Sequence, residues 1–453
     1  MKIFNYIFIV CLAIGALSCT GTLEDVNTDP SRLSSVDLRL LLPEVEAQAA
    51  NNMGFNPARV AGIIMQQYNG LDAQQLDYNK YILGEDAMNN YWRTGLYSGV
   101  LKSAQVLESQ ASAEESPFYS GVAKIYFASQ LADAASMFGD IPNTEALKGL
   151  EFVKPKYDSQ ESIYTAALTM LDNAISDLSV SGDVAGGGDI IYGGSATSWV
   201  KAANGLKARY LMHTVKRNAG NAALAIASAD ASFASNAENA SFPFETAQTG
   251  NNPLAAFGQE RPNTLGINSN FVAMLEGDPR ASKYYVEVEG VLQYFDLGNS
   301  NLVWAQDDSP MPLISYTEVM FIKAEAQSMT GADASASLAA AVQSSMDLNG
   351  IAADDATAYV SGLGSADIQT IIEEAYKAYF GFNFLQTWTN YRRTGFPALT
   401  PSADASPSFN PSGVVPQRYL YVESETQTNS DNVAAASANQ GGSLLDNTLW
   451  AFQ

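Results

Sequence analysis

The sequence predicts a mainly α-helical protein with long irregular loops and small β-hairpins. In many stretches apolar residues recur three or four positions apart, which is the spacing of one buried face of an amphipathic helix. Clusters of turn-forming residues separate these stretches and limit their length. The predicted helices span residues 38–53, 57–68, 85–109, 117–138, 161–178, 197–218, 315–329, 334–346 and 366–388.

The ends of several helices are marked in the sequence. The helix over 117–138 is followed by Gly139-Asp140-Ile141-Pro142, a strong stop. Asp158 or Ser159 can cap the next helix, which carries Glu161 in its first turn. Recurrent helix pairs of poor mutual identity then suggest a degenerate repeat of the tetratricopeptide kind, wound as an α–α superhelix. No clean period of about 34 residues is visible in the chain.

Three regions interrupt the helical pattern. Residues 69–84 are loop-like. The glycine-rich stretch 185–195 predicts a tight turn or hairpin, because it lacks the spacing of a phosphate-binding loop. Residues 236–312 are rich in Asn, Pro, Gly, Phe and Tyr and contain short alternating pieces at 284–291 and 292–295. They predict a mostly irregular excursion, and insertions of that length are usually functional.

We therefore expect one domain over residues 36–453. Its parts are an N-terminal helical part (36–235), a loop-rich ligand-binding excursion (236–312), C-terminal helices (313–395) and a loop-rich C-terminal segment (396–453). After removal of a short N-terminal segment the chain is still long enough for a sizeable core.

The first 18 residues have the layout of a bacterial signal peptide. Lys2 precedes an apolar run over residues 3–17, which is shorter than the ~20 residues of a membrane-spanning helix. Small residues then lead into Cys19, as in a lipoprotein whose cysteine is acylated, for example with palmitate, after cleavage. Residues 19–35 then form a lipidated tether. Cleavage by ordinary signal peptidase and an uncleaved anchor are the alternatives.

Composition argues against several partners and chemistries. The chain has 48 acidic and 24 basic residues and a formal net charge of −24, which argues against nucleic acid and against anionic lipid surfaces. Its two cysteines, Cys11 and Cys19, both lie near the start, so we expect neither a disulfide framework nor a thiolate metal site. No zinc or EF-hand spacing is present, and we expect no metal and no cofactor. A calcium site built from loop carboxylates and carbonyls stays open.

Catalysis finds little support in the sequence. His213 is the only histidine, and it shares a predicted helix face with Leu206 and Tyr210, so we expect a packed, hydrogen-bonded side chain. A Ser-His-Asp triad would depend wholly on that residue, and no pair of carboxylates is singled out for glycoside hydrolysis. We therefore expect a protein that is not an enzyme. A surface hydrolase is the alternative, which a single essential carboxylate would reveal.

Other conspicuous residues have structural explanations. Glu318 and Glu325 lie on one predicted helix, where pairing with a neighbouring lysine or arginine is the simplest account. Arg392-Arg393 predict an internal clamp to carboxylates and helix ends. Three tryptophans fall within helical periodicity and are assigned to the core, namely Trp92, Trp199 and Trp388.

Aromatic residues outside the predicted helices suggest a binding platform. A pyranose ring has an apolar face that stacks on Tyr or Trp, while its hydroxyls bond to Asp, Asn, Gln and Arg. Two clusters supply candidate ligand-binding residues, namely Tyr68, Gln74, Gln75, Tyr78 and Tyr81 in the first loop and Tyr284, Tyr294, Trp304 and Asp307 in the excursion. For each residue singly, packing of its loop onto the helices is the competing interpretation.

A set of motifs, in this order along the chain, resembles the SusD/RagB family and specifically its divergent SusD-like branch. They are Asn27-Thr28-Asp29-Pro30, Phe138-Gly139-Asp140-Ile141-Pro142, Glu145-Ala146-Leu147, Pro155-Lys156-Tyr157-Asp158, Asp189-Ile190-Ile191-Tyr192-Gly193-Gly194, Trp199, Asn204, Arg209, Asp278-Pro279-Arg280, Ser315-Tyr316-Thr317-Glu318-Val319, Ala324-Glu325-Ala326, Trp388, Arg392-Arg393-Thr394-Gly395, Pro397, Pro416, Arg418, Tyr421, Glu423 and Asn429. No single motif is specific, but their order and spacing cover nearly the whole chain after the signal segment.

The resemblance implies a lipid-anchored protein of the cell outer membrane, facing the cell surface and built on tetratricopeptide-like helices. It implies capture of a nutrient, oligosaccharide in the first place, for a SusC-like TonB-dependent transporter over which the protein acts as a lid. A peptide-binding protein, or a subunit that mainly gates the transporter with little ligand affinity of its own, is the alternative within the family. Members of the family are not catalysts.

Overall fold

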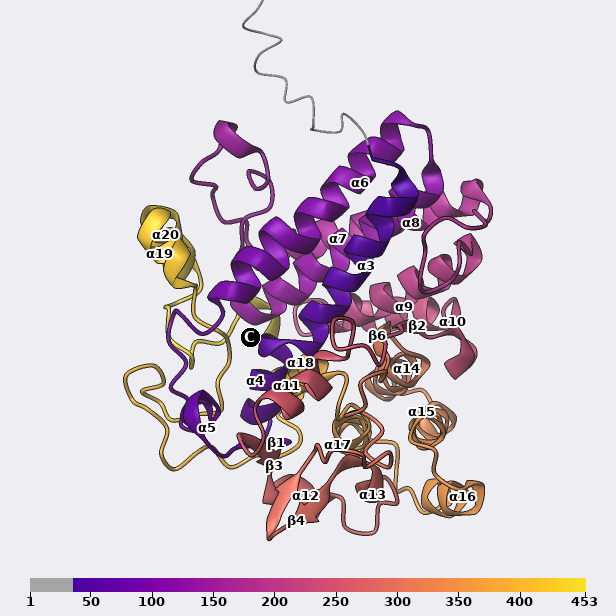
Figure 1. Cartoon of the computed structure of the whole chain (residues 1–453), viewed down its shortest axis with the longest axis vertical. Helices are drawn as coiled ribbons and strands as arrows, with labels where there is room; N and C mark the ends of the chain where they lie inside the picture. Colours follow the sequence, from indigo (N-terminus) through magenta and orange to yellow (C-terminus); the bar gives the residue numbers. More distant parts are fainter. Residues whose placement is uncertain (1–35) are drawn as a thin grey trace, which may run out of the picture. The chain divides into compact units, whose positions relative to one another are not determined.

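The N-terminal half is built from long helices packed side by side. The computed structural model describes residues 36–453, so the expected signal peptide (1–18), Cys19 and the tether up to residue 35 lie outside the described residues. The helices are α3 (Leu38–Gly54), α4 (Asn56–Ile64), α5 (Ala73–Asn79), α6 (Lys102–Ala113), α7 (Pro117–Phe138), α8 (Gln160–Ser181), α9 (Ala196–His213) and α10 (Asn221–Asp230), with a π-helix, η1, at Tyr91–Leu101. In Figure 1, α3, α6 and α7 run alongside one another, and α8, α9 and α10 continue the array.

Helix α7 lies at the centre of this array. All but three of its 22 residues are buried, and many of them are Ala or Ser, which let neighbouring helices approach closely. The helix ends at Gly139, whose φ of +86° is a backbone conformation that residues with a side chain rarely adopt. The predicted stop at residues 139–142 is therefore confirmed.

The C-terminal helices continue the stacking. They are α14 (Tyr316–Thr330), α15 (Ser335–Leu348), α16 (Ala353–Ser361), α17 (Ile368–Ala378) and α18 (Phe384–Thr394). Helix α14 packs against α10, α15 and α17, and Figure 1 shows α14, α15 and α16 following one another down one side of the molecule. The prediction of a mainly helical, tetratricopeptide-like scaffold is confirmed.

The segment 236–312 contains only short elements. They are a 3₁₀ turn η3 (Asn236–Glu238), α11 (Pro253–Glu260), α12 (Ser269–Met274), α13 (Ala281–Tyr284), β2 (Ala240–Phe242), β3 (Leu265–Ile267), β4 (Val286–Val288) and β5 (Val291–Gln293), with β6 (Met311–Ile314) across its end. Strands β4 and β5 form a hairpin within the region of the alternating pieces, and its turn at residues 289–290 falls inside the first piece.

Two other antiparallel pairs are not hairpins and join segments that are distant in sequence. Strand β1 (Tyr68–Gly70) pairs with β3, and β2 pairs with β6. The expectation that the small sheets are hairpins is therefore wrong for these two pairs. The β1–β3 ladder fastens the middle of the irregular segment to the chain after α4, and the β2–β6 ladder joins the beginning of the segment to its end.

Several predicted boundaries are also wrong. Residues 69–84 contain β1 and α5 rather than only a loop, and the helix predicted over 85–109 is η1 followed by α6. The helix predicted over 366–388 is two helices, because the chain turns at Gly381 with a φ of +89°. A Cβ at Gly381 would lie 2.3 Å from the Cβ of Trp304, so only glycine lets the two segments approach this closely.

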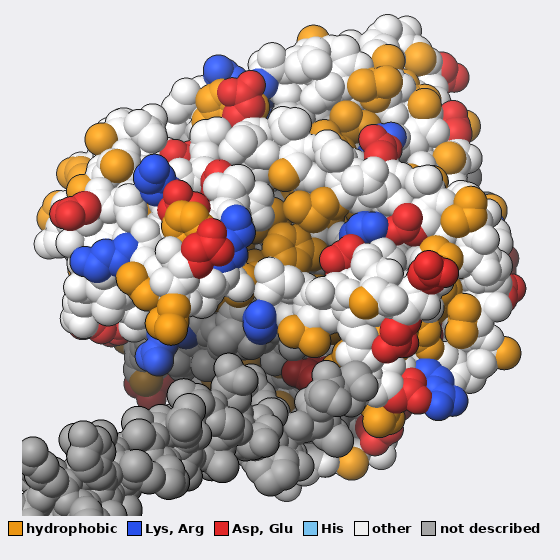
Figure 2. Space-filling model, turned by 90° about the horizontal axis from the view of Figure 1, so that it is seen from above, with side chains coloured by type: hydrophobic (Ala, Val, Ile, Leu, Met, Phe, Trp, Pro, Cys, Tyr) orange, Lys and Arg blue, Asp and Glu red, His pale blue; other side chains and the backbone are white. Residues whose placement is uncertain are grey.

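The C-terminal segment is mostly irregular, as predicted, with short helices α19 (Glu423–Thr428) and α20 (Ser430–Asn439) and the 3₁₀ turn η4 (Trp450–Phe452). Another 3₁₀ turn, η2, spans Gly149–Glu151. Residues 38–453 form one compact unit. Within 36–453, every helix is too short or too polar to cross a bilayer. Figure 2 shows one face, on which acidic and basic side chains are interspersed and hydrophobic side chains line a central depression.

Candidate ligand-binding groove

A groove of about 890 Å³ opens where α3 meets α4, between α5, the turn after residue 85 and α11. Its lining combines two phenylalanines, two arginines and many amide side chains. The lining residues are Asn51, Phe55, Asn56, Arg59, Asp72, Ala73, Gln74, Gln75, Asp86, Ala87, Asn89, Asn90, Thr249, Asn251, Pro253, Ala256, Phe257, Glu260, Arg261 and Thr264. The volume is in the range of sites that hold small molecules.

The aromatic part of the groove comes from the residue before α4 and from the middle of α11. Phe55 is the extended residue between α3 and α4, and it is 43% exposed. Phe257 lies on α11 and is half-buried. The guanidinium of Arg59 lies 3.9 Å from the Phe257 ring centre and 5.9 Å from that of Phe55. The two rings and the guanidinium together form a partly apolar floor of the groove.

Helix α11 is held in place by backbone and amide hydrogen bonds. The side chain of Asn252 caps it by accepting from the Leu254 N–H at 2.8 Å, and it donates to the Ser309 carbonyl at 2.8 Å. Asp307 accepts from Asn251, which lines the groove, and from Gln259. The end of the irregular segment thus fixes the position of Phe257.

Helix α5 forms a wall between this groove and a second cavity of about 400 Å³. Residues with positive φ stand at both of its ends, Ala73 at +49° and Tyr81 at +55°. Asn79 fastens the wall to β1, because its side chain accepts from the Gly70 N–H and donates to the Gly70 carbonyl. Strained backbone held by such contacts is typical of functional sites.

The predicted aromatic platform is not exposed. Six of the predicted ligand-binding residues are at most 8% exposed, namely Tyr68, Tyr78, Tyr81, Tyr284, Tyr294 and Trp304. Tyr68 packs against Tyr294 at a ring-centre distance of 5.1 Å, and Trp304 packs against Phe382 at 4.6 Å. The expectation that these rings stand free on loops is wrong, because the loops use them to build their own apolar core against the helices.

The polar residues of the prediction lie closer to the groove. Gln74 is exposed and lines it, and Gln75 lines it while being buried. Asp307 lies behind the groove, where it holds Asn251. Tyr81 lines the second cavity, and its hydroxyl oxygen accepts from the Ser402 N–H. The first predicted cluster therefore lies at the wall of the groove, whereas its tyrosines serve packing.

Sequence reasoning missed Phe55, Arg59 and Phe257. Residues 57–68 were expected to form one regular helix, so Arg59 gave no signal. An aromatic residue directly before Asn-Pro at a helix start was the available indication for Phe55. Phe257 carried no such indication, because the irregular segment has aromatic residues throughout.

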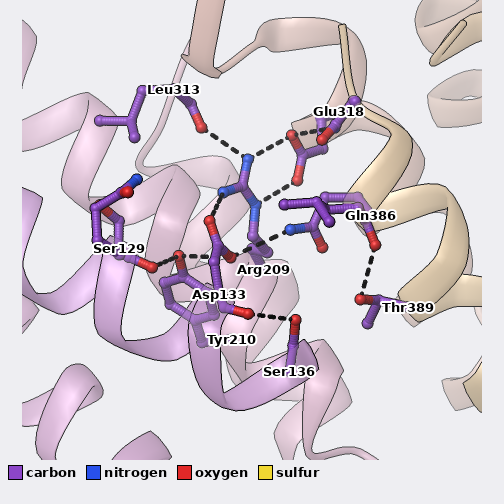
Figure 3. A network of polar contacts seen from close by, with 12 residues as sticks. Ser129, Asp133, Ser136, Arg209, Tyr210, Leu313, Glu318, Gln386 and Thr389 are labelled. Carbon is purple, nitrogen blue, oxygen red and sulfur yellow. Dashed lines mark hydrogen bonds and ion pairs between the residues drawn. The ribbon is translucent and has the colours of Figure 1, made fainter. Parts of the chain in front are cut away.

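A buried polar network lies away from the groove and holds four helices together (Figure 3). Arg209 of α9 donates from Nε and Nη2 to Glu318 of α14, at 2.6 and 2.7 Å, and Asp133 of α7 lies 3.8 Å from its Nη1. Gln386 of α18 donates to Asp133 at 3.3 Å. Burial raises the pKa of Asp133 to about 6.

His213 extends this network and is a core residue, as predicted. It is 3% exposed, and its ring nitrogens lie 3.0 Å from the Tyr164 hydroxyl and 2.7 Å from the Gln386 side-chain oxygen. Burial lowers the pKa of His213 well below its usual value, so the ring stays neutral. No group of carboxylate, histidine or cysteine side chains in the described part of the chain could hold a metal ion.

The predicted clamp and core residues are also confirmed. Arg393 forms an ion pair with Glu325. Arg392 donates to the carbonyls of Ser136 and Gln417 and stacks on Trp388. The three tryptophans assigned to the core are at most 2% exposed.

Comparisons with a family model and with solved structures point to the same protein family. The family model described as "Starch-binding associating with outer membrane", SusD-like, matches residues 30–422. A search of curated proteins finds no match.

Solved structures share the fold. A SusD/RagB family protein from Bacteroides thetaiotaomicron is 24% identical with a TM-score of 0.74, covering 92% of this chain and 99% of that one. A chitin-binding protein is 24% identical with a TM-score of 0.75 and the same coverage. A SusD homolog from Bacteroides fragilis is 21% identical with a TM-score of 0.73, covering 90% of this chain and 100% of that one.

The family match spans most of the chain, and the fold agrees over nearly all of it. SusD-like proteins are non-catalytic, so the prediction that this protein is not an enzyme is confirmed. The chain belongs to the SusD-like family of outer-membrane nutrient-binding proteins.

Proposed function

We propose that the protein captures an oligosaccharide at the cell surface and delivers it to a SusC-like TonB-dependent transporter, for which it acts as a lid. The observation that carries this proposal is the groove between α4, α5 and α11, which combines partly exposed aromatic faces with many amides. Phe55 and Phe257 suit the apolar face of a pyranose ring, and amides such as those of Asn51 and Asn90 suit its hydroxyls. The family description names starch and one similar structure is named chitin-binding, and both ligands are glycans.

The proposal includes a lipid anchor at Cys19. Support comes from the apolar run that ends in small residues before this cysteine and from the outer-membrane association of the family. Mass spectrometry of the mature N-terminus is expected to show a diacylglyceryl-modified, acylated cysteine. An unmodified terminus at any other position would contradict the anchor.

Calorimetric titration against a panel of oligosaccharides and peptides tests the binding site. Phe257→Ala is expected to weaken binding of the captured glycan about tenfold or more, because the loss of one stacked ring is worth on the order of 1–2 kcal/mol. Phe152→Ala, which removes a half-buried ring outside the groove, is the matched control. Equal affinity of Phe257→Ala and wild type would overturn the assignment of the groove.

Co-purification tests the role as a lid. Wild type and Phe257→Ala are both expected to co-purify with the transporter, because the substitution removes a ring of the groove and leaves the rest of the surface unchanged. A peptide as the only bound ligand would change the substrate class. No binding by the isolated protein, together with intact co-purification, would favour a mainly gating subunit.

A further inference from the structure

One arginine in the groove lacks the partners that other buried arginines have. Six arginines are buried among the described residues, namely Arg59, Arg209, Arg280, Arg392, Arg393 and Arg418. Three of them form ion pairs with carboxylates, namely Arg209, Arg280 and Arg393. Arg392 and Arg418 have no ion pair but donate at least three hydrogen bonds each, mostly to backbone carbonyls.

Arg59 makes one hydrogen bond, from Nη2 to the Asn56 side-chain oxygen at 3.2 Å. Its Nε is buried without an acceptor, as are Arg393 Nε and Arg418 Nη2, and no hydrogen bond joins Arg59 Nη1 to another described residue. The side chain is 7% exposed, so water replaces few of the missing acceptors. A buried cation without a counter-charge is costly, and proteins normally pair it.

The surroundings of Arg59 favour a negative charge at the same place. Arg59 lies in the first turn of α4, whose N-cap residue Phe55 provides no side-chain acceptor for the free N–H groups. The positive end of the helix dipole therefore adds to the guanidinium charge. Arg261 also lines the groove.

The carboxylates in the lining do not neutralise this site. Asp72, Asp86 and Glu260 are exposed, so water and salt screen their charges. None of them forms an ion pair with Arg59. The floor of the groove is therefore positively charged and its exposed rim carries both acidic and basic side chains, although the chain as a whole has a net charge of −24.

We propose that Arg59 binds a ligand carboxylate and that the captured oligosaccharide is acidic, with a uronic acid or similar sugar acid over the floor of the groove. The carboxylate accepts hydrogen bonds from the Nη1 amino group of Arg59. Phe257, which stacks on the guanidinium, offers the apolar face beside it for the sugar ring. This inference rests on the proposed function, since it names the substrate class of the same groove.

The test uses arginine side-chain NMR of the full-length protein in detergent, with ¹⁵N-labelled arginine. Arg59 is assigned from the resonance that Arg59→Lys removes. Sodium glucuronate, galacturonate and acetate are the probes, glucose and galactose are their neutral counterparts, and the exposed Arg217 reports non-specific anion effects. Saturable shifts of Arg59 with the carboxylates, and not with the neutral sugars, are the expected result.

Two outcomes would overturn the proposal: no shift of Arg59 with any carboxylate, or equal shifts with the neutral sugars. Calorimetry separates this failure from failure of the proposed function. Binding of neutral glycans that Phe257→Ala abolishes and Arg59→Lys leaves unchanged would keep the groove and refute the acidic ligand. For an acidic oligosaccharide, Arg59→Lys is expected to reduce affinity at least tenfold, about 1.4 kcal/mol.

Discussion

Glu46 is a fully buried carboxyl group whose surroundings raise its pKa and so favour the protonated form. It lies on α3 against Asp189 in the glycine-rich segment, and its Oε2 accepts from the Ile190 N–H at 2.9 Å. Asp189 accepts four N–H groups, those of Ile191, Tyr192 and Gly194 and the Trp199 indole. Asp189 is therefore well suited to carry the negative charge. Glu46 Oε1 is buried without a hydrogen-bond partner, and a proton on Glu46 allows it to donate to the neighbouring Asp189 carboxylate.

The size of the effect follows from the pKa. Burial first, and then the charge of Asp189, raises the pKa of Glu46 from 4.5 to about 9. Between these two values the folded chain holds a proton that the unfolded chain has released, so the free energy of unfolding falls as pH rises. The slope is about 1.4 kcal/mol per pH unit, which gives on the order of 4 kcal/mol between pH 5 and pH 8.

Glu46→Gln removes this dependence, because the amide can donate to Asp189 and still accept from Ile190. We expect wild type and the variant to have similar stability at pH 5 and the variant to be more stable by about 4 kcal/mol at pH 8. Urea denaturation followed by tryptophan fluorescence at several pH values measures both. Glu276→Gln, an exposed substitution, controls for the change in net charge. A difference between variant and wild type that stays constant from pH 5 to 8 would refute the protonated Glu46.

Two further predictions concern stability. Glu318→Ala should destabilise the fold by about 3–5 kcal/mol, because Arg209 keeps its buried charge and loses its bidentate partner. The control is Asp172→Ala, which removes a more exposed ion pair and should cost less than about 1 kcal/mol in chemical denaturation. Equal costs for the two variants would contradict a special contribution of the buried pair. Gly70→Ala should push α5 away from β1, since a Cβ would lie 1.8 Å from the Gln75 carbonyl oxygen. A lower melting temperature and weaker glycan binding are therefore expected together. An unchanged melting temperature with unchanged glycan affinity would contradict this packing.

The helical part of the fold could be predicted because its signals are local. The apolar spacing of residues 117–138 and the stop at Gly139 lie within one segment, and the structure confirms both. The breaks at Gly99 and Gly381 were missed, because an isolated glycine is also tolerated inside a helix. Whether it breaks the helix depends on what packs against it, which for Gly381 is Trp304.

The candidate site could be predicted only in part. Gln74 and Gln75, which were predicted as ligand contacts, line the groove, since polar residues in a short connecting segment tend to line surfaces. The exposure expected for the tyrosines was wrong, because a ring in an irregular segment can face either solvent or an apolar neighbour with the same local sequence. Tyr68 meets Tyr294, more than two hundred positions away, and nothing near either residue indicates that contact.

The sequence by itself determined the helical class, the core tryptophans, the packed histidine and the family, since each depends on residue type and on spacing within a segment or along the chain. Only the tertiary structure decided which rings are buried, which strands pair and where the groove opens. The β1–β3 pairing and the stacking of Phe257 on Arg59 bring together residues separated by about two hundred positions. Burial and counter-charge are properties of that assembled neighbourhood, so an arginine such as Arg59 becomes conspicuous only when its missing partners can be seen.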